Sequence, residues 1–176
     1  IVIRNWPESA TLAGGRVLDA QGNRQGLRSA AHKLFLQTRA EAPENAEAWI
    51  RSQLVRDGIA QRDALLCPST FSTAQIDSAA TSLVNAKAAL AAGDWLADES
   101  RWQQAREAIA NAVNAEHRAH PERPGLTIEL LRPLAQKAFP SGDVFAELLE
   151  DLCQNGFKRQ AKYITSLSHK PALPPN

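Results

Sequence analysis

The sequence predicts a mainly α-helical protein with small β-hairpins, preceded by a short strand pair. Three observations support this expectation. Apolar residues recur at helical spacing over most of the chain, short apolar runs flank tight turns at two places, and the same order of helices and strands occurs twice. At 44% apolar and 22% charged residues, the composition is typical of a globular domain.

The first residues predict the strand pair. Ile1-Val2-Ile3 and Arg16-Val17-Leu18 are apolar runs on either side of a stretch that contains Pro, Ser and Gly. A two-stranded sheet is marginal in water by itself, and the residues that follow have a helical pattern. We therefore expect the chain to be a fragment whose first residues are the last strands of an upstream β-domain. The lack of methionine agrees with this expectation.

Residues 21–44 are expected to form a linker helix. A polar segment with two glycines follows Asp19, and Leu27 to Arg39 then places its apolar residues on one helical stripe. Ala42-Pro43 ends this helix, because the residue before a proline avoids the helical conformation.

Residues 45–99 predict three helices and a hairpin. Asn45 is a suitable N-cap for the first helix, which Asp57-Gly58 stops. A short helix is expected over Ala60 to Cys67, and Ser72 caps a third helix. Apolar runs on both sides of Gly93-Asp94 then predict a β-hairpin.

Residues 100–170 repeat that order. Ser100 is expected to cap a long helix that continues through Arg118, where a segment rich in Pro and Gly breaks it. Thr127 is expected to cap a shorter helix, and residues 141–155 a third one.

The strand pair predicted from Phe157 to Leu167 matches the first hairpin, because Gly93-Asp94-Trp95-Leu96 and Ala161-Lys162-Tyr163-Ile164 occupy equivalent places. Three helices followed by a β-hairpin is the winged-helix arrangement, a helix-turn-helix with a strand wing. The sequence therefore predicts tandem winged-helix domains over 45–99 and 100–170, with an extended tail at 171–176.

The net charge of +1 provides no overall field that would attract nucleic acid or an anionic membrane. The chain has no apolar run of membrane-spanning length, so no membrane partner is expected and the cytoplasm is the default compartment. Cys67 and Cys153 lie among apolar neighbours, and each is expected to be a reduced thiol in a core.

The third helix of each unit is poorly suited to DNA. Residues 72–84 contain Asp77 and no lysine or arginine. Residues 141–155 contain four carboxylates, also without a cation. Carboxylates repel phosphates, so we do not expect either helix to read a major groove.

The second wing has the opposite character. The segment from Leu152 to Asn176 contains lysines, an arginine and aromatic residues, but no aspartate or glutamate. Such a wing can contact an RNA backbone non-specifically. The alternative is a solvated wing whose lysines keep a sheet edge from pairing with other chains. The candidate RNA-binding residues are Lys158, Arg159, Lys162, Tyr163, His169 and Lys170.

Catalytic motifs are not apparent in the sequence. It contains no phosphate loop, no Asn-Lys-x-Asp motif and no Ser/His/Asp or Cys/His set, so we expect neither an enzyme nor a bound cofactor here. His117 and His120 are three apart, but no further ligand has metal-site spacing, and no metal is expected. Trp49, Trp95 and Trp102 have the spacing of core residues.

Residues 3–19, Ile3-Arg4-Asn5-Trp6-Pro7-Glu8-Ser9-Ala10-Thr11-Leu12-Ala13-Gly14-Gly15-Arg16-Val17-Leu18-Asp19, resemble the end of the last β-barrel of the selenocysteine-specific translation elongation factors, the SelB family. Gly93-Asp94-Trp95-Leu96 and Ser100-Arg101-Trp102 also resemble the winged-helix extension of that family. Ala13 stands where the family pattern has its first glycine.

The resemblance implies that residues 1–20 are terminal strands of an upstream β-barrel. It also implies that the full-length protein is a GTPase that uses GTP and Mg²⁺ upstream of this segment and brings selenocysteinyl-tRNA to the ribosome at an mRNA hairpin. This chain would be the middle segment, a rigid arm between the GTPase body and a downstream hairpin-binding module. The alternatives are a tandem winged-helix scaffold for proteins and a DNA-binding regulator.

Overall fold

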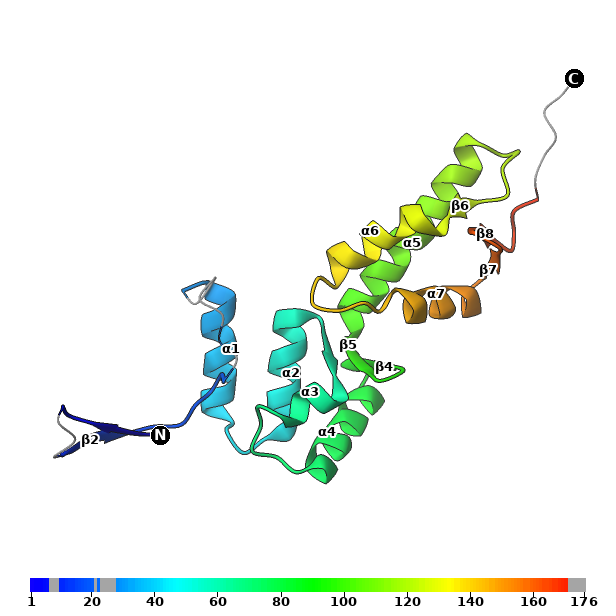
Figure 1. Ribbon diagram of the computed structural model, residues 1–176. Coiled ribbons are helices and arrows are strands. Elements are labelled where there is room, and N and C mark those ends of the chain that lie inside the picture. The colour runs from blue at the N-terminus through cyan, green and yellow to red at the C-terminus, as the bar shows by residue number, and fades with distance from the viewer. Residues whose placement is uncertain (7–9, 21, 23–27, 171–176) are drawn as a thin grey trace, which may run out of the picture.

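The computed structural model describes residues 1–6, 10–20, 22 and 28–170 (Figure 1). Within these residues helices dominate, and the strands form three small antiparallel sheets. The expected mainly α fold with small hairpins is therefore confirmed. None of the described helices combines the length and the apolar character needed to cross a membrane.

The strand pair at the start consists of β1 (Val2–Arg4) and β2 (Thr11–Gly14), and every residue in it is exposed. It forms a sheet of its own at one end of the molecule (Figure 1). The prediction of a strand over Arg16 to Leu18 is wrong. Backbone and side-chain bonds between Asn5 and Ala10 close a shorter loop, so Thr11 is already opposite Arg4.

The first unit follows a helix that packs against it. Helix α1 (Ala30–Glu41) begins at the N-cap Ser29, and the predicted start at Leu27 lies outside the described residues. The unit itself contains α2 (Ala46–Asp57), β3 (Ile59–Gln61), α3 (Arg62–Leu66), α4 (Thr73–Asn85), β4 (Ala89–Ala92) and β5 (Trp95–Asp98).

Local signals in this unit are confirmed. Asn45 accepts the Ala48 N–H and caps α2, and Gly58, with a φ of +83°, ends it. Ser72 and Gln75 form the reciprocal capping box of α4. The predicted start of a helix at Ala60 is wrong, because residues 59–61 form a strand that pairs with β5 and gives the sheet order β3-β5-β4.

The second unit repeats the first, with the order helix, strand, helix, helix, strand, strand and the equivalent sheet order β6-β8-β7. Its elements are α5 (Glu99–Ala119), β6 (Leu126–Thr127), α6 (Ile128–Ala138), α7 (Phe145–Gln154), β7 (Phe157–Gln160) and β8 (Tyr163–Ser166). The equivalence of the two hairpins is confirmed, since Ala92 pairs with Trp95 and Gln160 with Tyr163.

Two helix starts in this unit differ from the prediction. The N-cap of α5 is Asp98 and not Ser100. Asp98 is the last residue of β5, and its side chain accepts the Arg101 N–H. Helix α7 begins at Phe145, four residues after the predicted start at Ser141. The residues before it make a close contact, since Gly142 packs against Trp95 of the first unit.

The linker helix is held by a caged arginine. Arg39 is 3% exposed, and its guanidinium lies 3.4 Å from the Trp49 ring centroid and 4.0 Å from that of Phe35. It donates to Ser52 Oγ and to the Leu18 carbonyl oxygen. Burial lowers the Arg39 pKa to about 10, so the group stays charged at neutral pH. The cage joins α1, α2 and the segment around Leu18 that precedes them.

Replacing the caged arginine tests this anchor. Arg39→Ala leaves the Leu18 carbonyl without its donor and opens a cavity between two rings, so we expect a loss of about 3 kcal/mol in the free energy of unfolding. Urea unfolding followed by circular dichroism measures it. Arg51→Ala, at an exposed position of α2, is the control and should change stability by less than about 0.5 kcal/mol. Equal effects of the two variants would contradict the anchor.

Candidate nucleic-acid interface

The hairpin of β7 and β8, predicted above to be the second wing, brings together three of the six candidate RNA-binding residues. Lys158 pairs with Thr165, and Gln160 with Tyr163, so Lys158 and Tyr163 share one face of the hairpin. Lys162 lies in the turn that Ala161 makes with a φ of +51°. Its Nζ is 5.6 Å from the centroid of the Tyr163 ring, a cation–π distance. Two cations and one aromatic ring therefore lie together.

Arg159 points to the other face of β7. It pairs with Ile164, which is fully buried, and its Nε donates to the Ala161 carbonyl oxygen at 3.5 Å. Strand β7 is an edge strand, because β8 occupies the centre of the sheet. Cations on both faces of an edge also suit the alternative that they prevent pairing with other chains.

His169 does not belong to the wing surface. Its ring stacks on that of His117 with centroids 3.7 Å apart, and its Nε2 lies 3.1 Å from the Arg123 carbonyl oxygen. The sequence alone offers no sign of this contact, because the two histidines lie 52 positions apart on a helix and a loop. Lys170 follows it and is exposed. The structure thus separates His169 from Lys158, Lys162 and Tyr163.

His117 links helix α5 to the base of the wing. Its Nε2 accepts the Ser166 N–H at 3.2 Å, while its Nδ1 is buried without a hydrogen-bond partner among the described residues. Burial and the neighbouring His169 lower the His117 pKa, and Glu116 opposes them. His120 is turned to Glu122 instead, and no group of three metal-ligating residues occurs in the described part of the chain.

The third helices have the surfaces that the sequence predicted. Asp77 is exposed on α4, and Glu147 and Glu150 are on α7. Asp151 is already engaged, because its carboxylate accepts the Trp102 indole N–H at 2.8 Å and pairs with Arg106 at 3.3 Å.

Helix α7 is also partly covered by the first hairpin. A Cβ at Gly93, in the turn of that hairpin, would lie 3.7 Å from Glu147 Oε1. A helix with acidic side chains and a hairpin beside it cannot enter a DNA groove favourably.

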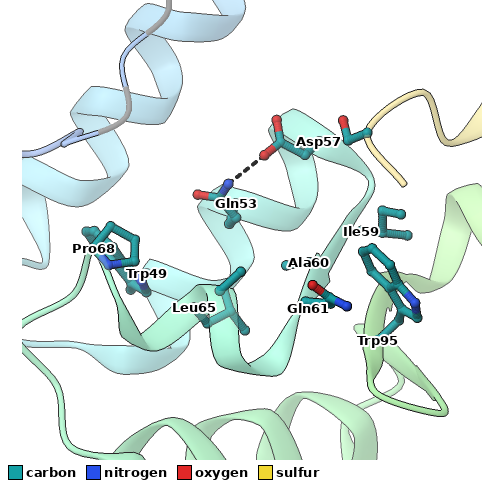
Figure 2. A pocket seen from close by; sticks show the side chains of 11 residues that line it. Trp49, Gln53, Asp57, Ile59, Ala60, Gln61, Leu65, Pro68 and Trp95 are labelled. Carbon is teal, nitrogen blue, oxygen red and sulfur yellow. Dashed lines mark hydrogen bonds between the residues drawn. The ribbon is translucent and has the colours of Figure 1, made fainter. Parts of the chain in front are cut away.

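The pocket in Figure 2 lies mainly between α2, β3 and α3 of the first unit, is also lined by Ser141 of the second unit, and measures about 210 Å³. Trp49 and Trp95 line it from different elements, and Gln53 donates to Asp57, whose carboxylate also accepts from Arg56. Gln53 and Asp57 thus bond to each other, whereas the buried indole N–H of Trp49 has no hydrogen-bond partner among the described residues. Among the residues that line it, no nucleophile is paired with a base.

The two cysteines differ from the prediction of core thiols. Cys67 is exposed and Cys153 is half-buried, and both are free. Cys67 follows a helix of only five residues, which is too short to carry it under the core. Trp102 is fully buried as expected, whereas Trp49 and Trp95 remain partly accessible.

Compared with models of protein families and with curated proteins, the chain matches none.

Charge reversal tests the wing as an RNA contact. Lys158→Glu combined with Lys162→Glu should weaken binding to fluorescein-labelled oligo(U) about tenfold at low salt, because two phosphate contacts become repulsive. Fluorescence anisotropy measures it, and random duplex DNA should show no micromolar binding to either protein.

The matched control changes the net charge equally at exposed positions elsewhere, Lys33→Glu combined with Lys87→Glu. If both double variants weaken oligo(U) binding equally, or if neither does, the wing is a protected sheet edge rather than an RNA contact.

The buried histidine predicts a pH dependence of stability. The His117 pKa is lowered in the folded protein, so the unfolded chain binds the proton more readily. The contribution of His117 is therefore complete above pH 6.5 and is lost as the pH falls through its lowered folded-state pKa. His117→Asn should reduce the slope of unfolding free energy against pH between about pH 7 and 5, measured by urea titration.

The groups that face His117 are His169 from the loop after β8, Glu116 from its own helix, and Arg123, which pairs with Glu116. His120→Asn is the control and should change the slope less than His117→Asn does, because the His120 side chain is exposed and contacts Glu122. A slope identical in wild type and His117→Asn would contradict the assignment.

Proposed function

We propose that the two repeated units are tandem winged helices and that together they form a rigid arm. Each unit has the order helix, strand, helix, helix, strand, strand, and in each the last strand lies between the other two. A helix-turn-helix followed by a strand wing has this order. The arm would hold the domains on its two sides at a fixed distance and angle from each other.

The observation that carries the proposal is the joint between the units. Asp98 is both the last residue of β5 and the N-cap of α5, so no linker separates the first wing from the second unit. Ile59 and Ala97 of the first unit belong to the same apolar core cluster as Trp102 and Phe139 of the second. A core shared by two units resists their relative rotation, because rotation would expose it to water.

Close backbone contacts support a fixed angle. A Cβ at Gly142 would lie 2.5 Å from Trp95 and 2.8 Å from Ile59, so only glycine allows this approach. Arg101 of α5 in addition donates to the Val55 carbonyl oxygen of the first unit at 3.0 Å. The joint is therefore held by two separate contacts between groups of different units.

The likeness of residues 3–19 to the selenocysteine-specific elongation factors suggests which protein this arm belongs to. We propose a middle segment of such a cytoplasmic factor, between its GTPase body and a downstream module that binds the mRNA hairpin. GTP, Mg²⁺, selenocysteinyl-tRNA and the ribosome would be partners of the full-length protein. The exposed apolar side chains of the strand pair, with Val2 64% and Leu12 65% accessible, suit strands that another sheet covers.

The alternative of a protein-binding scaffold shares the acidic third helices but does not account for the exposed strand pair. A DNA-binding regulator requires a cationic third helix, which neither α4 nor α7 provides.

Distance measurements across the joint test the rigid arm. Spin labels at the exposed Cys67 and at Gln154→Cys, in a Cys153→Ala background, should give one narrow distance distribution by pulsed electron resonance. Gly142→Val should broaden or shift it, because the new side chain overlaps Trp95. Gly22→Val is the control, since its nearest neighbour would be 3.6 Å away. A broad distribution in the parent protein would contradict a rigid joint.

The same substitution in the full-length protein tests the assignment to translation. A reporter with a UGA codon and a selenocysteine hairpin should be read through with the parent protein and less with Gly142→Val. Absence of read-through by the parent protein, with the distance distribution still narrow, would leave a rigid arm and overturn its assignment to selenocysteine incorporation.

A further inference from the structure

A groove of about 530 Å³ runs between α5 and α6 on the second unit. Its floor is made of small and apolar side chains, among them Ala105 and Ala108 of α5 and Leu134 and Ala138 of α6. Pro140, just after α6, also lines it. Because alanines stand where larger side chains would fill the space between two helices, the surface stays hollow.

The charged side chains that line the groove are both cationic. Arg101 is held in place by its bond to the Val55 carbonyl oxygen, and Lys137 is exposed on α6. None of the residues described as lining the groove carries a carboxylate. The groove thus combines an apolar floor with positive charge, whereas the protein as a whole has a net charge of only +1.

Apolar surface continues beyond the groove. Leu130 lies one helical turn before Leu134 on α6 and is 62% exposed. Val55, whose carbonyl oxygen Arg101 binds, is 54% exposed. Large aliphatic side chains beside a hollow and two cations are typical of surfaces that bind another protein.

We propose that the α5–α6 groove, defined by the residues above, binds an amphipathic segment of a partner protein. The apolar side chains of the bound segment would lie on the alanine floor of the groove. The carboxylates of that segment would pair with Arg101 and Lys137. Charge complementarity selects an acidic partner. RNA fits less well, because the lining has no aromatic ring on which a base could stack. The inference goes beyond the proposed arm and does not rest on it.

Binding of designed peptides tests the groove. The probe is a fluorescein-labelled helical peptide with two leucines at i and i+4 flanked by glutamates, compared with the same peptide carrying lysines for glutamates. The full chain should bind the acidic peptide about tenfold more tightly by anisotropy. Ala108→Trp, which fills the groove from an exposed helical position, should lower that affinity about tenfold.

Ala146→Trp is the matched control, because Ala146 is an exposed alanine on α7 outside the groove, and this variant should bind like the parent. Lys137→Glu gives a second readout that needs no bulky side chain, since it should remove the preference for the acidic peptide.

Equal binding of the two peptides, or binding that Ala108→Trp leaves unchanged in a folded protein, would overturn the proposal. So would a dimer in light scattering that Ala108→Trp abolishes, which would make a second copy the occupant. Oligo(U) binding that Ala108→Trp weakens would identify a nucleic-acid surface instead and would also overturn the proposal.

Discussion

The arrangement of this protein depends on the direct passage from strand β5 into helix α5. Asp98 is the last residue of the strand, and its side chain caps the helix. The sheet of the first unit therefore passes directly into the first helix of the second. Leu96, just before Asp98 in the chain, and Trp102, just after it, are both fully buried. A loop inserted here would move Ile59 and Ala97 of the first unit away from Trp102 and Phe139, with which they form one apolar cluster, and the proposed arm would lose its fixed angle.

A second fixed point lies at the other end of the first unit, where Arg39 holds α1 on α2. The arginine cage joins the linker helix and the segment around Leu18 to the first unit, and the shared apolar cluster joins the two units. These contacts in series are what supports the proposed rigid arm.

The surfaces left open by this framework divide by charge. Acidic side chains lie on α7, where the first hairpin also packs, and cations lie on the second wing and in the α5–α6 groove. With a net charge of +1, the whole molecule has little long-range field, so each surface acts locally and is sensitive to single substitutions. His117 adds a pH-sensitive contact at the base of the wing.

The sequence by itself determined what depends on neighbours along the chain. The caps at Asn45 and Ser72, the stop at Gly58 and the turns of both hairpins were predictable, because their hydrogen bonds span a few residues. Only the tertiary structure decided the strands β3 and β6, of three and two residues, which exist because distant strands pair with them. It also decided the stacking of His117 on His169, since long-range contacts leave no local pattern in a sequence.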